Sequence, residues 1–105
     1  MAARVNQDNF ENEVLQAEGM VIVDFYSDSC IPCKQMAAIL GELEDDFEDR
    51  IKIVKVNVNF DETLANQYGI MASPTLLFFK GAKEISRLRG IHKKAVVQEL
   101  IEQNL

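Results

Sequence analysis

Hydrophobic residues along the chain fall into short blocks that alternate between a helical and an extended pattern. The segment DNFENEVLQ carries Phe10, Val14 and Leu15 at helical spacing, with Asp8 as its expected N-cap and Glu11 three residues later. The next segment, MVIVDFY, is rich in β-branched and aromatic residues, which predicts a strand buried on both faces. The chain is therefore expected to begin with a helix and a buried strand.

The same alternation continues towards the C-terminus. A long helix to about Glu48 is predicted by apolar residues at helical spacing: Met36, Ile39, Leu40, Leu43 and Phe47. IKIVKVNV predicts a second strand, and DETLANQYG predicts a short helix that starts near Asp61 and ends at Gly69. SPTLLFFK and EISRLRG predict two strands joined by a turn at Gly81. HKKAVVQELIEQ predicts a final helix whose inward side chains are Ala95, Val96, Leu100 and Ile101.

This order of elements predicts the fold class. Strands that alternate with helices pair in parallel through right-handed crossovers, whereas the last two strands are too close for a crossover and must form an antiparallel hairpin. The pattern gives only a faint indication of a short first strand around Arg4 and Val5. We expect an α/β fold with a mixed central β-sheet of four to five strands flanked by about four helices, in a single domain over residues 1–105.

Composition and charge narrow the classes of function. The formal net charge is −6, which argues against nucleic acid and against an anionic membrane surface. The N-terminal residues show no apolar signal-peptide core, and the longest apolar runs are too short to span a bilayer. We expect a soluble, cytoplasmic protein that acts as a monomer.

The two cysteines, Cys30 and Cys33, stand between the first buried strand and the long helix, separated by two residues. Three interpretations are open. A structural disulfide across so short a loop would remove little entropy from the unfolded chain. A metal site needs about four ligands, and beyond this pair the chain offers the single histidine His92, unless two copies share a site. The third interpretation, a redox-active dithiol, is favoured.

The position of the pair supports redox chemistry. The thiolate is the nucleophilic form of cysteine, and the N-terminus of a helix lowers the thiol pKa through its unpaired N–H groups and dipole. Cys30 is expected at such a terminus, and Pro32 suits the first helical turn. Cys33 would lie one turn deeper, close enough to attack a mixed disulfide formed on Cys30.

Over nearly its whole length the chain resembles the thioredoxin family. The resemblance rests on VDFYSDSCIPCK, VKVNVNFDETLANQYGI, SPTLLFFKGAKE and RLRGIHKKAVVQELIEQNL. It implies a thioredoxin fold, with Cys30 as the attacking thiol and Cys33 as the resolving thiol. It also implies that Ser73 and Pro74 form a loop with a cis peptide bond.

Asp24 requires an explanation on physical grounds alone, because burying an acid in the middle of VIVDF costs several kcal/mol unless it is paired or neutral. The resemblance identifies it as the buried carboxylate below the cysteines. Burial should raise its pKa and allow it to exchange a proton with Cys33. Alternatively Lys55 satisfies the carboxylate structurally, and both roles can hold together.

The resemblance further implies a surface that binds an extended substrate segment beside the cysteines. Its expected members are Ser29, Ile31, Pro32, Ser73, Pro74, Gly90 and Ile91. We interpret His92 as a surface residue, and Met36 and Met71 as packing residues.

Several positions depart from the common form of the family. Ser29 replaces a tryptophan, Ile31 a glycine and Ala38 a helix-kinking proline. Ser73 replaces an apolar residue or threonine, and Asp28 is expected to raise the pKa of Cys30 by repulsion. These changes indicate an atypical member with altered substrate choice and potential.

The sequence therefore predicts reduction of protein disulfides through a mixed disulfide. No cofactor site is expected, because the chain has no glycine-rich dinucleotide motif. Electrons would come from a separate thioredoxin reductase, linked to NADPH or to ferredoxin. The alternatives are an oxidase or isomerase, whose direction depends on reduction potential, and a protein-binding module with no essential redox role.

Overall fold

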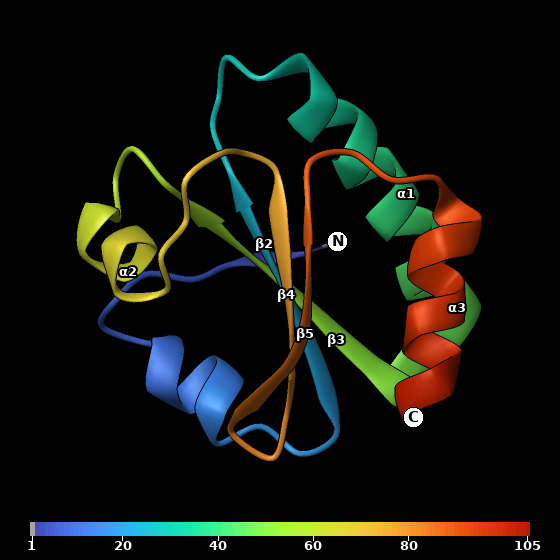
Figure 1. Ribbon diagram of the computed structural model, residues 1–105. Helices are drawn as coiled ribbons and strands as arrows, with labels where there is room; N and C mark the ends of the chain where they lie inside the picture. Colours follow the sequence, from blue (N-terminus) through green and yellow to red (C-terminus); the bar gives the residue numbers. More distant parts are fainter. Residues whose placement is uncertain (1) are drawn as a thin grey trace.

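The computed structural model describes residues 2–105, which fold around one five-stranded sheet (Figure 1). Its strands are β1 (Ala3–Arg4), β2 (Met20–Tyr26), β3 (Ile51–Asn57), β4 (Thr75–Lys80) and β5 (Lys83–Arg89). Its α-helices are α1 (Ile31–Phe47), α2 (Glu62–Gln67) and α3 (Lys94–Asn104), and two short helices are the π-helix η1 (Glu11–Leu15) and the 3-10 turn η2 (Glu48–Arg50).

The sheet is mixed, as predicted. Its strand order is β1-β3-β2-β4-β5, with β1, β3 and β2 parallel and with β4 antiparallel to both β2 and β5. The faint signal near Arg4 corresponds to β1, which Val5 extends by donating its N–H to the carbonyl of Lys55. The β4–β5 hairpin turns at Gly81 and Ala82, which both have positive φ.

Two apolar cores cover the two faces of the sheet. In Figure 1, α1 and α3 lie on one side of the sheet, whereas η1 and α2 lie on the other. Side chains alternate between the faces along β2, so that Met20 and Ile22 pack under α1 while Val21 and Val23 face the opposite core. Asp24 continues the Met20–Ile22 row, which directs its carboxylate towards α1.

The first helix differs from its prediction. It is a single π-helical segment with Phe10 as N-cap and no side-chain cap, so the expected cap by Asp8 is wrong. The side chain of Asn6 accepts the backbone N–H groups of Asp8 and Asn9 and forms the turn instead. A short polar side chain that bonds to the backbone in this way offers it an alternative to helical hydrogen bonds and favours a turn.

The inward face of the last helix is also displaced from its prediction. Helix α3 begins at Lys94 and buries Val97 and Ile101, one turn apart. Val96 is 43% exposed and Ala95 is exposed, so their assignment to the core was wrong.

Candidate active site

The cysteine pair occupies the start of α1, as predicted. Cys30 is the N-cap residue in an extended conformation, and the backbone N–H of Cys33 donates to Cys30 Sγ over 3.1 Å. Pro32 lies in the first turn. The two sulfurs form a disulfide; Cys30 is half-buried, while only 4% of Cys33 is exposed. An N–H group aimed at Cys30 Sγ favours the thiolate when the bond is reduced.

The loop before β4 lies against this disulfide. The Ser73–Pro74 peptide bond is cis, in agreement with the resemblance. The carbonyl oxygen of Ser73 is 3.6 Å from Cys30 Sγ. The hydroxyl oxygens of Ser27 and Ser73 lie 3.2 Å apart, within hydrogen-bond distance. Sequence reasoning missed Ser27, because nothing in the chain pattern pairs residues so far apart.

Asp24 is buried beneath the cysteines, with 4% of its surface exposed. Within residues 2–105, its Oδ1 has no hydrogen-bond partner. Burial raises its pKa from 3.8 to about 7, and the positive charge of Lys55 opposes that rise with a smaller effect. The carboxyl group is therefore placed to both accept and release a proton near neutral pH.

Lys55 is the partner of Asp24 in the parallel register of β2 and β3. In the part of the chain that the structure describes, Oδ1 of Asp24 has no hydrogen-bond partner, and Lys55 affects the carboxyl group through its charge alone. Lys55 Nζ lies instead 5.6 Å from the centroid of the Tyr26 ring. The charge of Lys55 thus acts on Asp24 without direct contact, and the interpretation of Lys55 as its structural partner is not supported.

A small cavity connects the carboxylate with the resolving side of the disulfide. Asp24, Cys33, Ala37 and Lys55 line this cavity, whose volume is about 210 Å³. It gives Asp24 and Cys33 a shared space in which a water molecule can carry a proton.

Apolar side chains surround the cysteines on the surface. Ile31 is 71% exposed, Met71 is 91% exposed and Ile91 is 44% exposed. The backbone N–H of Gly90 donates to the Pro74 carbonyl, which holds the segment containing Ile91 beside the cis-proline loop. The interpretation of Met71 as a packing residue was wrong, whereas Met36 is fully buried as expected.

The remaining candidates lie at the edge of the site. Ser29 is exposed next to Cys30, and Asp28 accepts a hydrogen bond from the buried Asn57 amide at 3.2 Å. His92 is half-buried rather than fully on the surface, with Nδ1 3.2 Å from the Gly90 carbonyl oxygen.

Among residues 2–105, no group of three or more His, Cys, Asp or Glu side chains is arranged to hold a metal ion. Over the same range, every helix is too short or too polar to cross a bilayer.

Comparison with known proteins agrees with this geometry. The sequence profile of the Thioredoxin family matches residues 1–103. Thioredoxin 1 of Nostoc sp. (strain PCC 7120) is 36% identical over 104 residues, which cover 99% of this chain and 97% of the relative. The thioredoxin of Rickettsia bellii is 33% identical over the full length of both chains. The chloroplastic M-type thioredoxin of Chlamydomonas reinhardtii is 36% identical over 99% of this chain and 74% of the relative. The chain therefore belongs to the thioredoxin family and is a thiol–disulfide oxidoreductase that reduces protein disulfides through its Cys-x-x-Cys pair.

Proposed function

We propose that Cys30 is the nucleophile, Cys33 the resolving thiol and Asp24 the group that takes the proton from Cys33. The observation that carries this assignment is the N–H of Cys33 donating to Cys30 Sγ at the start of α1. In the reduced protein the Cys30 thiolate attacks a client disulfide, and one client sulfur leaves as a thiolate. Cys33 passes its proton to Asp24 and attacks Cys30, which releases the second client sulfur and closes the disulfide.

The client is proposed to bind over Ile31, Pro32, Ser73, Pro74 and Ile91, with Ser29 and Gly90 beside them. The carbonyl of Ser73 lies against Cys30 Sγ, and an extended client segment can pair with this stretch of backbone. Lys55 is proposed to tune the acidity of Asp24 through its charge.

We further propose that the protein is an atypical thioredoxin with the active-site sequence Cys-Ile-Pro-Cys. We propose that it forms a single domain over residues 1–105, works as a cytoplasmic monomer and receives electrons from a reductase linked to NADPH or ferredoxin. Reduction of clients is favoured in a compartment that is kept reducing. The family also serves other compartments, because one relative is named as chloroplastic.

The Cys33→Ser variant tests the order of the two attacks. Without the resolving thiol, Cys30 is expected to remain joined to clients and to the reductase, because no neighbouring sulfur can attack the mixed disulfide. Thiol-sensitive conjugates would be isolated and identified by mass spectrometry, with Cys30→Ser as the matched control. Equal conjugate yields from both variants would contradict the assignment of Cys30 as nucleophile.

The Ile31→Gly variant tests whether the exposed side chain next to Cys30 restricts access. Removing its bulk is expected to raise kcat/KM for a large folded disulfide client by about tenfold, the size of effect that a few methylene groups produce in a binding site. A small aromatic disulfide serves as the control substrate, because it needs little room around Cys30, and its rate should change little. A decrease for the large client would show that Ile31 contributes binding energy instead.

A further inference from the structure

A cavity with three serines in its wall, the serine cavity, lies beside Cys30 at one end of the sheet. Its volume is about 280 Å³. The residues that line it come from the segment after β2, the segment after β3 and the loop before β4: Ser27, Ser29, Val58, Asn59, Ile70, Met71, Ala72 and Ser73. Ser29 precedes Cys30 in the chain, and the carbonyl oxygen of Ser73 is 3.6 Å from Cys30 Sγ. A client joined to Cys30 is therefore within reach of this cavity.

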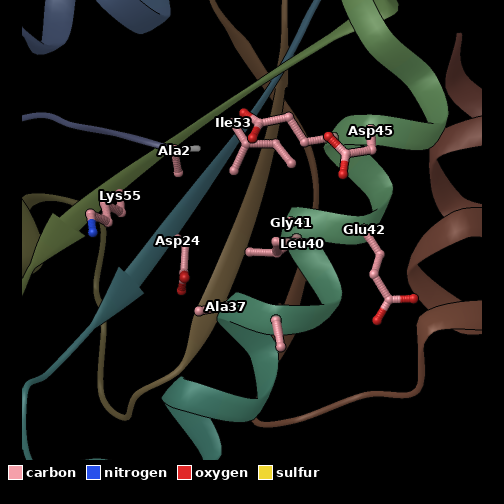
Figure 2. Close-up of a pocket in the computed structure, with 11 residues that line it drawn as sticks. Ala2, Asp24, Ala37, Leu40, Gly41, Glu42, Asp45, Ile53 and Lys55 are labelled. Atoms are coloured by element: carbon pink, nitrogen blue, oxygen red, sulfur yellow. The ribbon is translucent and has the colours of Figure 1, made fainter.

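The serine cavity differs in charge from the cavities beside α1. The largest of those, about 490 Å³, has Asp24, Glu42, Asp45 and Lys55 in its lining (Figure 2). Asp24 and Lys55 also line the smaller cavity at the disulfide. Within residues 2–105, by contrast, no ionisable side chain lines the serine cavity. A charged group that entered it would lose water without gaining a countercharge, so the cavity suits neutral groups.

Hydroxyl and amide groups give the serine cavity its capacity for hydrogen bonds. The hydroxyl oxygens of Ser27 and Ser73 lie 3.2 Å apart, so that one hydroxyl can donate to the other. That bond uses one O–H group and one lone pair, which leaves the two serines a second donor and further lone pairs. Ser29 and Asn59, both exposed, add a hydroxyl and a side-chain amide. The cavity can therefore both donate to and accept from a bound polar group.

Hydrogen bonds hold the walls of the serine cavity in place. Asn57 is fully buried at the end of β3, where its side-chain amide donates to Asp28 and accepts the backbone N–H of Asn59. It thus ties the segment after β2 to the segment after β3. In the loop before β4, the Thr75 hydroxyl donates to the Ala72 carbonyl over 2.6 Å. Walls that are fixed before a ligand arrives lose little conformational entropy when it binds, which favours selective binding.

Apolar side chains complete the lining. Val58 and Ile70 are half-buried, and Met71 is 91% exposed. They can pack against the aliphatic part of a bound side chain while the serines bond to its polar tip. A volume of about 280 Å³ is at the small end for a ligand pocket, so it suits one side chain of a client.

We propose that the serine cavity is a subsite that selects clients with a neutral hydrogen-bonding side chain, such as asparagine or glutamine, close to the reacting cysteine. This inference rests on the proposed attack by Cys30 and names the class of client that it favours. The client side chain enters the cavity, where Ser27 and Ser73 bond to its amide. Cys30 then forms a bond to the client sulfur, and the other sulfur of the client disulfide leaves as a thiolate with the electron pair.

A set of short peptides tests this preference. Each peptide has one cysteine in a disulfide with thionitrobenzoate and is otherwise alanine, except for a single asparagine, leucine or glutamate. That residue is moved through the two positions on either side of the cysteine. The Cys30 thiolate attacks the peptide sulfur, and thionitrobenzoate leaves as a coloured thiolate. With the reduced protein in excess, the rise in absorbance gives the second-order rate constant of the attack.

At one or more of these positions, the asparagine peptide is expected to react about tenfold faster than the leucine peptide, an effect of the size that one hydrogen bond produces. It should also react faster than the glutamate peptide, because the cavity offers no countercharge. Equal rates for asparagine and leucine at every position, or a preference for glutamate, would overturn the proposal.

Two variants assign the preference to the serine cavity. Ser27→Ala removes one hydroxyl, and Asn59→Leu replaces a polar side chain but keeps the backbone N–H that bonds to Asn57. Each is expected to lower the asparagine-to-leucine rate ratio by about threefold or more. Ser86→Ala, within β5 and outside the cavity, is the matched control and should keep the wild-type ratio. Loosening of the structure alone would slow both peptides equally, so an unchanged ratio in Ser27→Ala and Asn59→Leu would also overturn the proposal.

The Cys30→Ser variant separates this inference from the function on which it rests. If the wild type reacts equally with the asparagine and leucine peptides while Cys30→Ser releases no thionitrobenzoate, the subsite is wrong and the role of Cys30 stands. If Cys30→Ser releases thionitrobenzoate as fast as the wild type, Cys30 is not the nucleophile and the proposed function fails with the inference.

Discussion

The Cys30→Ser variant is expected to lose turnover of protein disulfides to the level of buffer alone, a fall on the order of 10³-fold or more. Serine in place of Cys30 cannot form the mixed disulfide, and its hydroxyl does not ionise at neutral pH. Cys33 cannot take over the attack, because only 4% of its surface is exposed. The measurement is reduction of an insulin-type disulfide with dithiothreitol as the electron donor.

Cys33→Ser is the matched control for this loss. It should also fail in steady-state turnover, but it should consume one equivalent of client disulfide in the first event, whereas Cys30→Ser should consume none. Residual turnover by Cys30→Ser above about a tenth of the wild-type rate would show that Cys33 can start the reaction. A protein-binding module would instead show equal client binding in all three forms and no reduction in any.

Most helices and strands of the fold could be predicted, because each has its own local pattern of apolar and polar residues. β2 is an apolar run interrupted only by Asp24, and β4 has four consecutive apolar residues; runs of this kind are typical of strands buried on both faces. The β4–β5 hairpin followed from the short connection around Gly81. The position of helix α3 was predicted correctly, but its inward face was not. Ala95, Val96 and Val97 are adjacent apolar residues, and the sequence alone does not say which of them packs against α1.

The sequence predicted those parts of the site whose residues lie close together in the chain. Cys30, Cys33 and Pro32 lie within one turn, so their arrangement follows from the start of a single helix. The contact of Ser27 with Ser73 depends on tertiary packing between β2 and the loop before β4, and no spacing rule reports it. The exposure of Met71 was missed for the same reason, since an apolar residue in a loop is read as core unless the surrounding surface is known.

The relation between Asp24 and Lys55 needed the structure as well. Their pairing in the register of β2 and β3 was implicit in two adjacent parallel strands. Whether the side chains touch depends on where Nζ goes, and the ring of Tyr26 draws it away from the carboxylate. An unpaired buried carboxyl group has a larger consequence for stability than a paired one would have.

Compared with the wild type, Asp24→Asn is expected to be more stable at alkaline pH than it is at acidic pH. The pKa of Asp24 is 3.8 as an unperturbed group and about 7 in the fold, so the folded state binds this proton more tightly than the unfolded state. The stability that depends on this proton is fully present below about pH 4 and is lost as pH rises through about 7. The loss in the free energy of unfolding approaches about 4 kcal/mol, because each unit of pKa difference corresponds to about 1.36 kcal/mol.

Asparagine occupies the same volume and does not titrate, so the free energy of unfolding of Asp24→Asn lacks this component. The difference between variant and wild type should therefore grow by up to about 4 kcal/mol between pH 4 and pH 8.5. Urea unfolding of the oxidised proteins at a series of pH values measures it, because the disulfide removes the cysteines from the titration. Asp49→Asn, at an exposed position in η2, is the control and should differ from wild type by less than about 0.5 kcal/mol throughout. A difference for Asp24→Asn that is equally flat would mean that the carboxyl group is ionised in the fold, and proton acceptance from Cys33 near neutral pH would lose its physical basis.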